Sequence, residues 1–420
     1  MKFRLLVTAV VIATLCPILL TPVGAVAATS PKHIAVIDAG SSGTRLTLFA
    51  DKEGSLVPQA IAEAKTKTRG LSSFASSPET AGIEAIAPLL AQLDEFLAQQ
   101  GIAKKEVPVA MLATAGMRNV QASDQNAAQS ILASTAATIE ASGHPTAANR
   151  ILPGLQEASL SWLDANVLGN TLTKRQGSVG IIEIGGASAQ VAFRSVKADG
   201  PYGSAVQLVR VAGMSIPVVA VSYLGLGGND ARSNMQTTND AGAFCFPNNS
   251  SGRAPSVFMP TSIRPVNSST AQFSWKRCAS AYNQTVATVG GTRTASAPVA
   301  PVVLRTLPGF NSATFIGLGS IQYIYSDLGI GNRPNERLAL QQSATQLCTG
   351  TNAWEKMLTA YGDDSSAFVE TLCSSSTYTY EFIFGASGVG ANPLRFATGE
   401  AGLPRAPAWT SGYAITVLDP

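Results

Sequence analysis

Histidine is almost absent from this chain, which has only His33 and His144 among its 420 residues. Neither lies in the motifs described below, so a carboxylate is the natural choice of general base within those motifs. Charged residues are also few, at 13%. Lys2 and Arg4 lie in a segment that we expect to be removed, and without them the formal charge is about +1. Proteins that bind nucleic acid usually carry a clear excess of positive charge, which this chain lacks. We therefore expect no nucleic-acid partner.

Cysteine is scarce as well, with Cys16 near the N-terminus and four residues later in the chain. The spacing offers no Cys-x2-Cys pair and the histidines are far away in sequence, which argues against a zinc site. An even number of cysteines in an exported chain favours disulfides. Several pairings are open, and we favour the local ones. The favoured pairs are Cys245–Cys278 and Cys348–Cys373.

Long apolar runs are missing after the N-terminal segment, so no later stretch is expected to span a bilayer. Residues 1–28 have the layout of a secretory signal, with basic Lys2 and Arg4, an apolar run over residues 5–20, and a small-residue cleavage site at 25–27. An uncleaved membrane anchor is the alternative, but prolines within the segment count against it. We expect a secreted or periplasmic protein with no membrane span after removal of the signal.

The stretch from Ile34 to Phe49 contains a short apolar strand, Asp38 at its end, a turn of Gly and Ser residues, and a second strand. Such a turn can present its N–H groups to an anion. A carboxylate would repel bound phosphate unless a cation lies between them, so the stretch indicates a metal–phosphate site. It is not a P-loop, because no Lys follows the glycines and the residues from Arg45 onward alternate like a strand. For this stretch alone, a plain hairpin is the alternative.

Other segments suit the same chemistry. A predicted strand over residues 107–112 runs into Thr114-Ala115-Gly116-Met117-Arg118, a second turn suited to phosphate. A predicted helix begins near Gln156 and places Glu157 in its first turn, where the helix dipole alone is a sufficient reason for a carboxylate. Further predicted helices cover residues 77–100 and 123–142, each closed by a glycine.

The layout of the first hairpin recurs at residues 179–193, where Glu183 takes the place of Asp38 at an offset of 145 residues. A glycine again follows two residues after the acid, and a second strand begins at Ser188. The repeat indicates two similar halves. If the two turns face each other across a cleft, the two acids flank one cation and both turns hold one phosphate chain.

Together these segments resemble the signature regions of the apyrases, which are nucleoside triphosphate diphosphohydrolases of the actin-like ATPase superfamily. The resemblance rests on residues 37–45, 113–118, 156–166 and 183–190, with weaker echoes at 222–227 and 409–413. It implies an α/β fold of two ribonuclease-H-like (actin-like) lobes with the active site in the cleft between them. We expect lobe I to comprise residues 29–165 and 386–420, and lobe II residues 166–385.

The resemblance also implies removal of terminal phosphates from nucleoside tri- or diphosphates with the help of Mg²⁺ or Ca²⁺. Glu157 matches the general base that takes a proton from water, and Ser188 and Gln190 match residues that position that water. Asp38 and Glu183 match acids that hold the metal largely through its water shell. The phosphate-binding regions contain Ser41, Ser42, Gly43, Thr44, Arg45, Thr114, Gly116, Arg118, Gly185, Gly186 and Ala187. We expect a monomer.

Several residues depart from the family pattern. The family usually has Asp where this chain has Glu183, and the extra methylene moves the carboxylate. Ala189 replaces a common Thr, and Ala158 replaces a common Gly beside the expected base. The segment from Gly43 to Arg45 resembles the diphosphatase-like branch of the family, which hints at the use of diphosphates.

Other readings of the motifs are open. An exopolyphosphatase or guanosine-pentaphosphate phosphohydrolase would share the lobes and the acid–glycine turns, and an actin-like nucleotide-binding protein would lack catalysis. The signal, the cysteines and residues 113–118 favour the apyrase. The sequence does not identify the nucleobase site, because aromatic residues of the second lobe are more often core. The residues that could stack on a base are Tyr323, Tyr325, Arg333, Tyr378, Tyr380 and Arg395.

Overall fold

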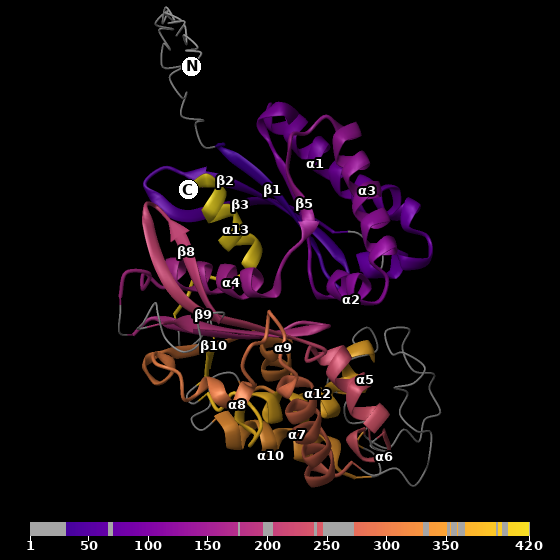
Figure 1. Cartoon of the computed structure of the whole chain (residues 1–420), viewed down its shortest axis with the longest axis vertical. Helices are drawn as coiled ribbons and strands as arrows, with labels where there is room; N and C mark the ends of the chain where they lie inside the picture. Colours follow the sequence, from indigo (N-terminus) through magenta and orange to yellow (C-terminus); the bar gives the residue numbers. More distant parts are fainter. Residues whose placement is uncertain are drawn as a thin grey trace, which may run out of the picture.

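A computed structural model of the chain describes residues 31–65, 70–174, 177–195, 205–238, 242–246, 273–330, 336–350, 353, 359, 366–391, 394–396 and 402–419. The predicted signal, residues 1–28, lies outside the described residues. Within them the strands form two sheets, one in the upper part of Figure 1 and one across its middle, above the helices of the lower part.

The first sheet has the strand order β3-β2-β1-β4-β5. β1, β2 and β3 form an antiparallel meander, whereas β4 pairs in parallel with β1 and with β5. Asp38, near the end of β1, pairs with Arg45 of β2. The strands are β1 His33–Ala39, β2 Thr44–Lys52, β3 Ser55–Lys65, β4 Val109–Ala113 and β5 Thr146–Ile151.

The second sheet repeats this arrangement in the order β11-β10-β6-β7-β9-β8. β6, β7 and β9 are antiparallel, β10 pairs in parallel with β6 and β11, and β8 is an additional edge strand on β9. Glu183 pairs with Gln190, which is the Asp38–Arg45 pairing displaced by 145 residues. The sequence repeat is therefore a repeat of topology. The strands are β6 Val179–Ile184, β7 Ser188–Arg194, β8 Val206–Val211, β9 Met214–Leu224, β10 Thr314–Gly319 and β11 Leu394–Phe396.

The two faces of the first sheet carry different helices, because side chains alternate along a strand. Ile37 of β1 shares a core with residues of α1 (Ala87–Gln100) and α3 (Gln125–Ser142). Val36 faces the other way, onto Trp409 and Leu418 of α13 (Trp409–Leu418). The sheet is thus sandwiched between helices from distant parts of the chain.

The second sheet is also covered on both faces. Helices α5, α7, α9, α10 and α12 share a core with Ile182 and Ile184 on one face, and α4 (Gly154–Leu168) covers the other through the fully buried Trp162. α4 also packs on α13, so these two helices lie between the sheets in Figure 1.

The predicted boundaries of lobe I and lobe II stay predictions. The remaining helices in the described ranges are α2 Ala115–Ser123, α5 Gly228–Thr238, α6 Gly242–Cys245, α7 Trp275–Gly291, α8 Pro301–Leu304, α9 Ser320–Asp327, α10 Glu336–Cys348 and α12 Ser366–Phe384.

α4 is held in place by the fully buried carboxylate of Asp164. Arg405 donates to both of its oxygens, at 2.6 Å and 2.8 Å. The hydroxyl of Ser411 and the backbone N–H of Ala408 also donate to it, at 2.9 Å and 2.8 Å. A buried carboxylate with this many donors is fully compensated. The segment that leads into α13 therefore clamps the middle of α4.

One predicted helix differs from the structure and another is confirmed. The helix expected over residues 77–100 is a 3-10 turn (Pro78–Thr80), a π turn (Gly82–Ile86) and then α1, which is closed by Gly101 with φ of 67°. The helix expected over residues 123–142 is present as α3, and α2, which was not predicted, precedes it. Asp124 separates the two, because its carboxylate caps α3 by accepting from the N–H of Ala127.

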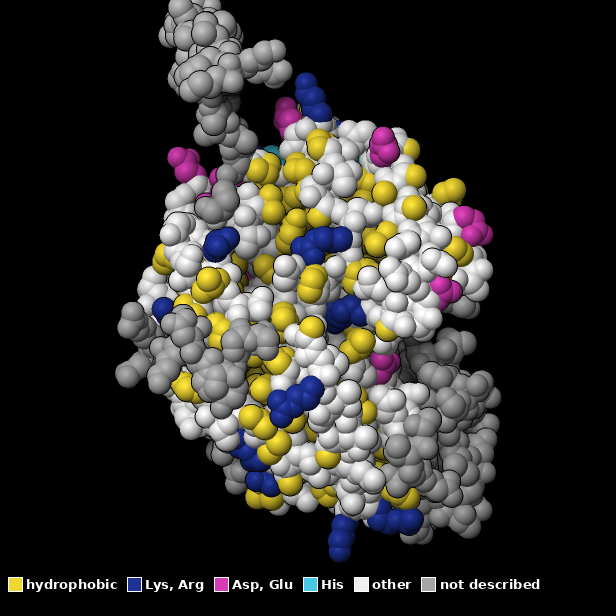
Figure 2. Space-filling model, viewed as in Figure 1, with side chains coloured by type: hydrophobic (Ala, Val, Ile, Leu, Met, Phe, Trp, Pro, Cys, Tyr) yellow, Lys and Arg dark blue, Asp and Glu magenta, His cyan; other side chains and the backbone are white. Residues whose placement is uncertain are grey.

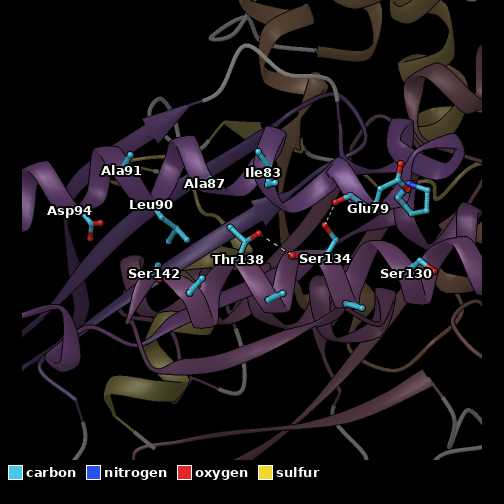
Figure 3. A pocket seen from close by; sticks show the side chains of 14 residues that line it. Glu79, Ile83, Ala87, Leu90, Ala91, Asp94, Ser130, Ser134, Thr138 and Ser142 are labelled. Carbon is cyan, nitrogen blue, oxygen red and sulfur yellow. Dashed lines mark hydrogen bonds between the residues drawn. The ribbon is translucent and has the colours of Figure 1, made fainter.

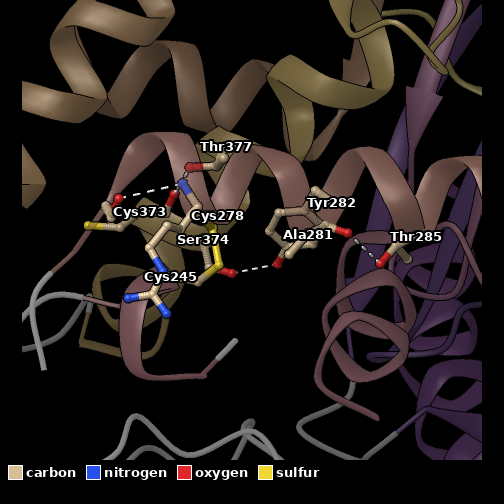
Figure 4. The surroundings of a disulfide bond; sticks show 10 residues. Cys245, Cys278, Ala281, Tyr282, Thr285, Cys373, Ser374 and Thr377 are labelled. Carbon is tan, nitrogen blue, oxygen red and sulfur yellow. Dashed lines mark hydrogen bonds between the residues drawn. A yellow bond between two sulfur atoms is a disulfide. The ribbon is translucent and has the colours of Figure 1, made fainter. Parts of the chain in front are cut away.

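The favoured disulfides are both present, as Cys245–Cys278 and Cys348–Cys373. The first joins α6 to α7 and the second joins α10 to α12. Figure 4 shows the first bond beside Tyr282, whose hydroxyl forms a hydrogen bond with Ser374 of α12. The local pairing predicted from spacing is confirmed, and both bonds lie in the lower, helix-covered part of the molecule.

The surface reflects the low charged fraction of the sequence. On the face shown in Figure 2, basic and acidic side chains are mostly isolated from one another among apolar and neutral ones. Of the helices in the described ranges, none is long and apolar enough to cross a membrane.

Candidate active site

The two acid–glycine turns meet face to face at the ends of β1 and β6. A Cβ atom placed on Gly186 would lie 2.3 Å from the Ser41 hydroxyl oxygen, so the second turn can approach the first only because that residue is glycine. Each turn is closed by the same backbone bond: Gly40 N–H donates to Gly43 C=O, and Gly185 N–H donates to Ser188 C=O, both at 3.0 Å. The repeat thus extends to single hydrogen bonds.

Arg118 connects three parts of this site. It lies on α2, and its guanidinium donates at 2.8 Å to Glu157 at the start of α4 and at 2.9 Å to the hydroxyl of Ser188. A third hydrogen bond, to the C=O of Leu152, fixes the guanidinium at 2.8 Å. The Arg118 and Glu157 side chains are only 11% and 9% exposed. The predicted base, one predicted phosphate ligand and one predicted water-positioning residue are therefore in contact.

Gln190 continues this network into the second sheet. Its side-chain amide donates to the hydroxyl of Ser188 and, at 3.1 Å, to the hydroxyl of Ser222, which lies opposite Gln190 in the β7–β9 pairing. Gln190, Ser188 and Ser222 are all buried. Sequence reasoning singled out residues 222–227 only as a weak echo of the family pattern and did not assign Ser222 to the site. The register of β9 against β7 brings it there.

Asp38 and Glu183 lie at the ends of β1 and β6, close enough to Glu157 for all three carboxylates to interact. Burial raises the pKa of Asp38 to about 7, which Glu157 reinforces and the nearby Arg45 opposes. Burial and the charge of Glu157 raise the pKa of Glu183 to about 8, against a hydrogen bond from Ser161 that lowers it. Three carboxylates that share a poorly solvated space repel one another, and a divalent cation would relieve this repulsion.

The donor set fits a cation that keeps part of its water shell. In the described ranges, no group of three or more His, Cys, Asp or Glu side chains could by itself hold a metal ion. Asp38 and Glu183 would therefore share the cation with water and with substrate oxygens. This is the mode that Mg²⁺ prefers, because Mg²⁺ dehydrates reluctantly and often binds through one or two carboxylates plus phosphates.

The predicted phosphate-binding residues line both sides of the contact between the turns. Ser42 and Arg45 are exposed, whereas the other residues of these turns are partly or fully buried. Next to them lies a cavity of about 290 Å³. Its lining includes Ser41, Gly116, Gly186 and Ala187 from the predicted set, and Ser72, Asn119, Val120, Ser123, Asn229 and Asp230, which were not predicted.

A hydrogen bond between α2 and α5 joins residues that line this cavity. The amide of Asn119 on α2 donates to Asp230 on α5 at 2.8 Å. Asn229 is itself held by Arg232, which donates to its side-chain oxygen at 2.7 Å. The N–H of Asn229 also donates to the C=O of Gly186 at 2.9 Å. α5 is therefore fixed to the second turn and to α2 at once.

A larger groove of about 850 Å³ lies elsewhere, between α1 and α3. Figure 3 shows it lined by small, hydroxyl and aliphatic side chains. Its charged lining residues are Glu79 and Asp94, and Asp94 is already bound by His144 and Lys104. The groove presents no convergent donors to an anion, so it is not the candidate site in spite of its size.

The residues considered for stacking on a nucleobase differ in how exposed they are. Tyr325, Tyr378 and Tyr380 are buried in the core of the second half. Tyr323 on α9 is 68% exposed. α9 begins beside β6, where the hydroxyl of Ser320 donates to the C=O of Ile184 at 3.1 Å. Arg333 and the side chain of Arg395 lie outside what the structure describes.

Comparison with known proteins gives consistent results. A family model described as the GDA1/CD39 (nucleoside phosphatase) family matches residues 25–419. "Probable apyrase 3" from Arabidopsis thaliana is 34% identical over 209 residues, which are 47% of this chain and 41% of that protein. A nucleoside-triphosphatase from Caenorhabditis elegans is 29% identical over 215 residues, which are 47% of this chain and 39% of the relative. The matches thus span less than half the length of these relatives.

The solved structures agree on the fold. A crystal structure of nucleoside triphosphate hydrolases from Neospora caninum superimposes with a TM-score of 0.59 at 14% identity and covers 93% of both chains. At this identity the likeness concerns the fold alone, and it confirms the predicted α/β architecture of two lobes. The family model, which matches nearly the whole chain, carries the identification: this chain belongs to the GDA1/CD39 (nucleoside phosphatase) family.

Proposed function

We propose that this protein is an exported apyrase that hydrolyses the terminal phosphates of nucleoside tri- or diphosphates. One observation carries the proposal: the guanidinium of Arg118 donates both to Glu157 at the start of α4 and to Ser188 at the second turn. The proposed base, a water-positioning hydroxyl and a phosphate-binding guanidinium thus lie within hydrogen-bond distance of one another. Phosphoryl transfer needs this kind of positioning and charge neutralisation more than it needs a strong nucleophile.

Glu157 acts as the general base in this proposal. No histidine lies in the site, and Glu157 is the buried carboxylate that contacts the Ser188–Gln190 network through Arg118. It would take a proton from the attacking water as the new O–P bond forms. General-base catalysis of this kind contributes roughly 10²–10⁴-fold.

Ser188 and Gln190 orient that water. The Gln190 amide donates to both Ser188 and Ser222, which fixes the Ser188 oxygen as an acceptor from Gln190 and from Arg118. The hydroxyl hydrogen of Ser188 is then free to donate to an incoming oxygen. Ser222 extends the predicted set of site residues by supporting Gln190 from β9.

The phosphate chain would lie between the two turns. Residues 41–45 and 185–187 contribute backbone N–H groups and hydroxyls, the exposed Arg45 contributes charge, and α2 begins directly after Thr114. The start of a helix favours an anion, because its first N–H groups are unpaired and its dipole is positive there. Bound Mg²⁺ or Ca²⁺, shared between Asp38 and Glu183, would neutralise charge on the phosphates and the leaving group.

Export and a monomeric state are parts of the proposal. The two disulfides suit an oxidising compartment, in agreement with the signal expected at residues 1–28. We place the enzyme in the periplasm or outside the cell, acting on free nucleotides there.

The test is phosphate release by the purified protein from ATP, ADP, UDP and long-chain polyphosphate, each with Mg²⁺, Ca²⁺ or EDTA. We expect release from nucleotides that EDTA abolishes. Release from polyphosphate alone would replace the apyrase with an exopolyphosphatase. Nucleotide binding without release from any substrate would leave a binding protein.

A further inference from the structure

Ser161 contacts Glu183, one of the two acids of the proposed metal site, although no feature of the sequence assigns a role to this serine. It lies on α4 one helical turn after Glu157, and its side chain is fully buried. Its hydroxyl donates to one carboxylate oxygen of Glu183 at 2.9 Å. The helix that carries the proposed base therefore also holds the acid of β6, the strand on which this helix packs.

This contact bears on the departure noted at Glu183, where apyrases usually have Asp. A glutamate reaches one methylene further from β6 than an aspartate would. In this structure the extra reach takes the carboxylate to α4, where the Ser161 hydroxyl occupies one of its oxygens. A hydrogen bond to a charged acceptor is among the stronger ones in proteins. The carboxylate is thus restrained on the side of α4.

We infer that Ser161 is a positioning residue that restrains Glu183 and thereby biases the metal site toward Mg²⁺ over Ca²⁺. Mg²⁺ keeps several waters and accepts a carboxylate held at a distance, whereas Ca²⁺ takes more oxygens and readily accepts both oxygens of one carboxylate. A Glu183 with one oxygen bound to Ser161 is poorly suited to bidentate ligation. The inference rests on the proposed function insofar as Glu183 serves the metal of that reaction.

The test measures ion binding rather than turnover. Dissociation constants for Mg²⁺ and Ca²⁺ are obtained by calorimetric titration of the full chain in the presence of a non-hydrolysable ATP analogue. Ser161→Ala is expected to shift the ratio of the two constants toward Ca²⁺ by about threefold to tenfold, the scale of one typical hydrogen bond. Ser159→Ala is the matched control, because this buried hydroxyl on the same helix donates within α4, to the C=O of Leu155 at 2.8 Å.

A second pair of variants tests whether the effect acts through Glu183. In a Glu183→Asp background the shorter side chain no longer reaches Ser161, so adding Ser161→Ala should change the ratio by less than about twofold. If Ser161→Ala does not fold, Ser161→Cys replaces it, because a thiol is a weak donor of similar shape and should shift the ratio in the same direction.

The outcomes separate this inference from the proposed function. An unchanged ratio in Ser161→Ala, or an equal shift in Ser159→Ala, would overturn the role of Ser161 even if the wild-type protein hydrolyses nucleotides. A shifted ratio in a protein that releases no phosphate would support the role of Ser161 and overturn the enzyme. An undiminished shift in the Glu183→Asp background would show that Ser161 does not act through Glu183.

Discussion

Glu157 is the residue on which the proposed chemistry depends most directly. Glu157→Gln keeps the size of the side chain and leaves an acceptor for Arg118, but it removes the proton acceptor. We expect kcat to fall by about three orders of magnitude while nucleotide binding is retained, the usual loss when a general base is removed. Turnover and analogue binding are measured in parallel, with Glu140→Gln on α3 as a control acid remote from the site. Near-native turnover would remove Glu157 from the role of base.

Asp38 and Glu183 should couple metal binding to protons. Their pKa values, about 7 and about 8, lie above the ordinary values of 3.8 and 4.5, so the metal-free folded protein keeps protons that the unfolded chain has lost. The free energy of unfolding of the metal-free protein therefore falls as the pH rises from about 4 to about 8, because the folded state must lose these protons. A bound cation should reverse this loss of stability. We expect Mg²⁺ affinity to increase from about pH 6 to about pH 8 and then to level off.

Calorimetry at pH 6.5 in two buffers with different ionisation enthalpies measures this coupling. Net proton release on Mg²⁺ binding is the expected result. A Mg²⁺ affinity that is the same at pH 6 and pH 8 would contradict it, because binding would then not require the ionised carboxylates.

How far a single residue could be predicted depends on how local its signal is. Asp38, Glu183 and the glycines after them follow from a strand, an acid and a turn that are contiguous in sequence. Ser161 and Ser222 lie within segments that resemble the family pattern, but no feature of the sequence marks these two serines themselves for a function. They enter the site only through the packing of α4 and the pairing of β9 with β7.

At the scale of elements, the disulfides are the main covalent support of the helical layer below the second sheet. They close loops between residues 33 and 25 positions apart. Loop entropy then gives each bond a contribution of about 3–4 kcal/mol to the free energy of unfolding. We expect reduction to lower the melting temperature clearly. Scanning calorimetry of the Cys245→Ser/Cys278→Ser protein with and without reductant measures each bond separately, and an unchanged melting temperature would contradict the prediction.

The elements themselves were predicted unevenly, for physical reasons. The strand–turn–strand units and α4 follow local patterns that tertiary structure does not override. α2 was not predicted, because the sequence suggested a phosphate-binding turn at residues 114–118, and its separation from α3 depends on a single capping side chain, Asp124. The irregular start before α1 has a tertiary cause: Gly82 approaches α3 so closely that a Cβ would lie 2.1 Å from the Thr138 hydroxyl oxygen. No pattern in one sequence reports such an approach.

At the scale of the molecule, α2 holds the two halves together beside the site. Arg118 binds Ser188 and Asn119 binds Asp230, so consecutive residues of one helix contact the second turn and α5. We expect Asn119→Ala to loosen this closure and to increase the radius of gyration of the nucleotide-free protein. A non-hydrolysable nucleotide analogue should restore the compact form by bridging the turns.

Small-angle scattering with and without the analogue tests this. Ser123→Ala is the matched control, because Ser123 lines the same cavity but donates to the C=O groups of Asn119 and Val120 within its own helix. Scattering profiles that do not change with Asn119→Ala or with nucleotide would contradict a closure controlled by α2.

The contacts that hold Asp164 determine when, during synthesis of the chain, α4 can be fixed in place. α4 carries Glu157 and Ser161 and is complete by residue 168, but the groups that bind Asp164 come from residues 405–411. Because a chain emerges with its N-terminal part first, this support is missing during most of synthesis. We expect the growing chain to hydrolyse no nucleotide until these contacts form. In an exported protein, that delay would spare the nucleotides of the compartment in which the chain is made.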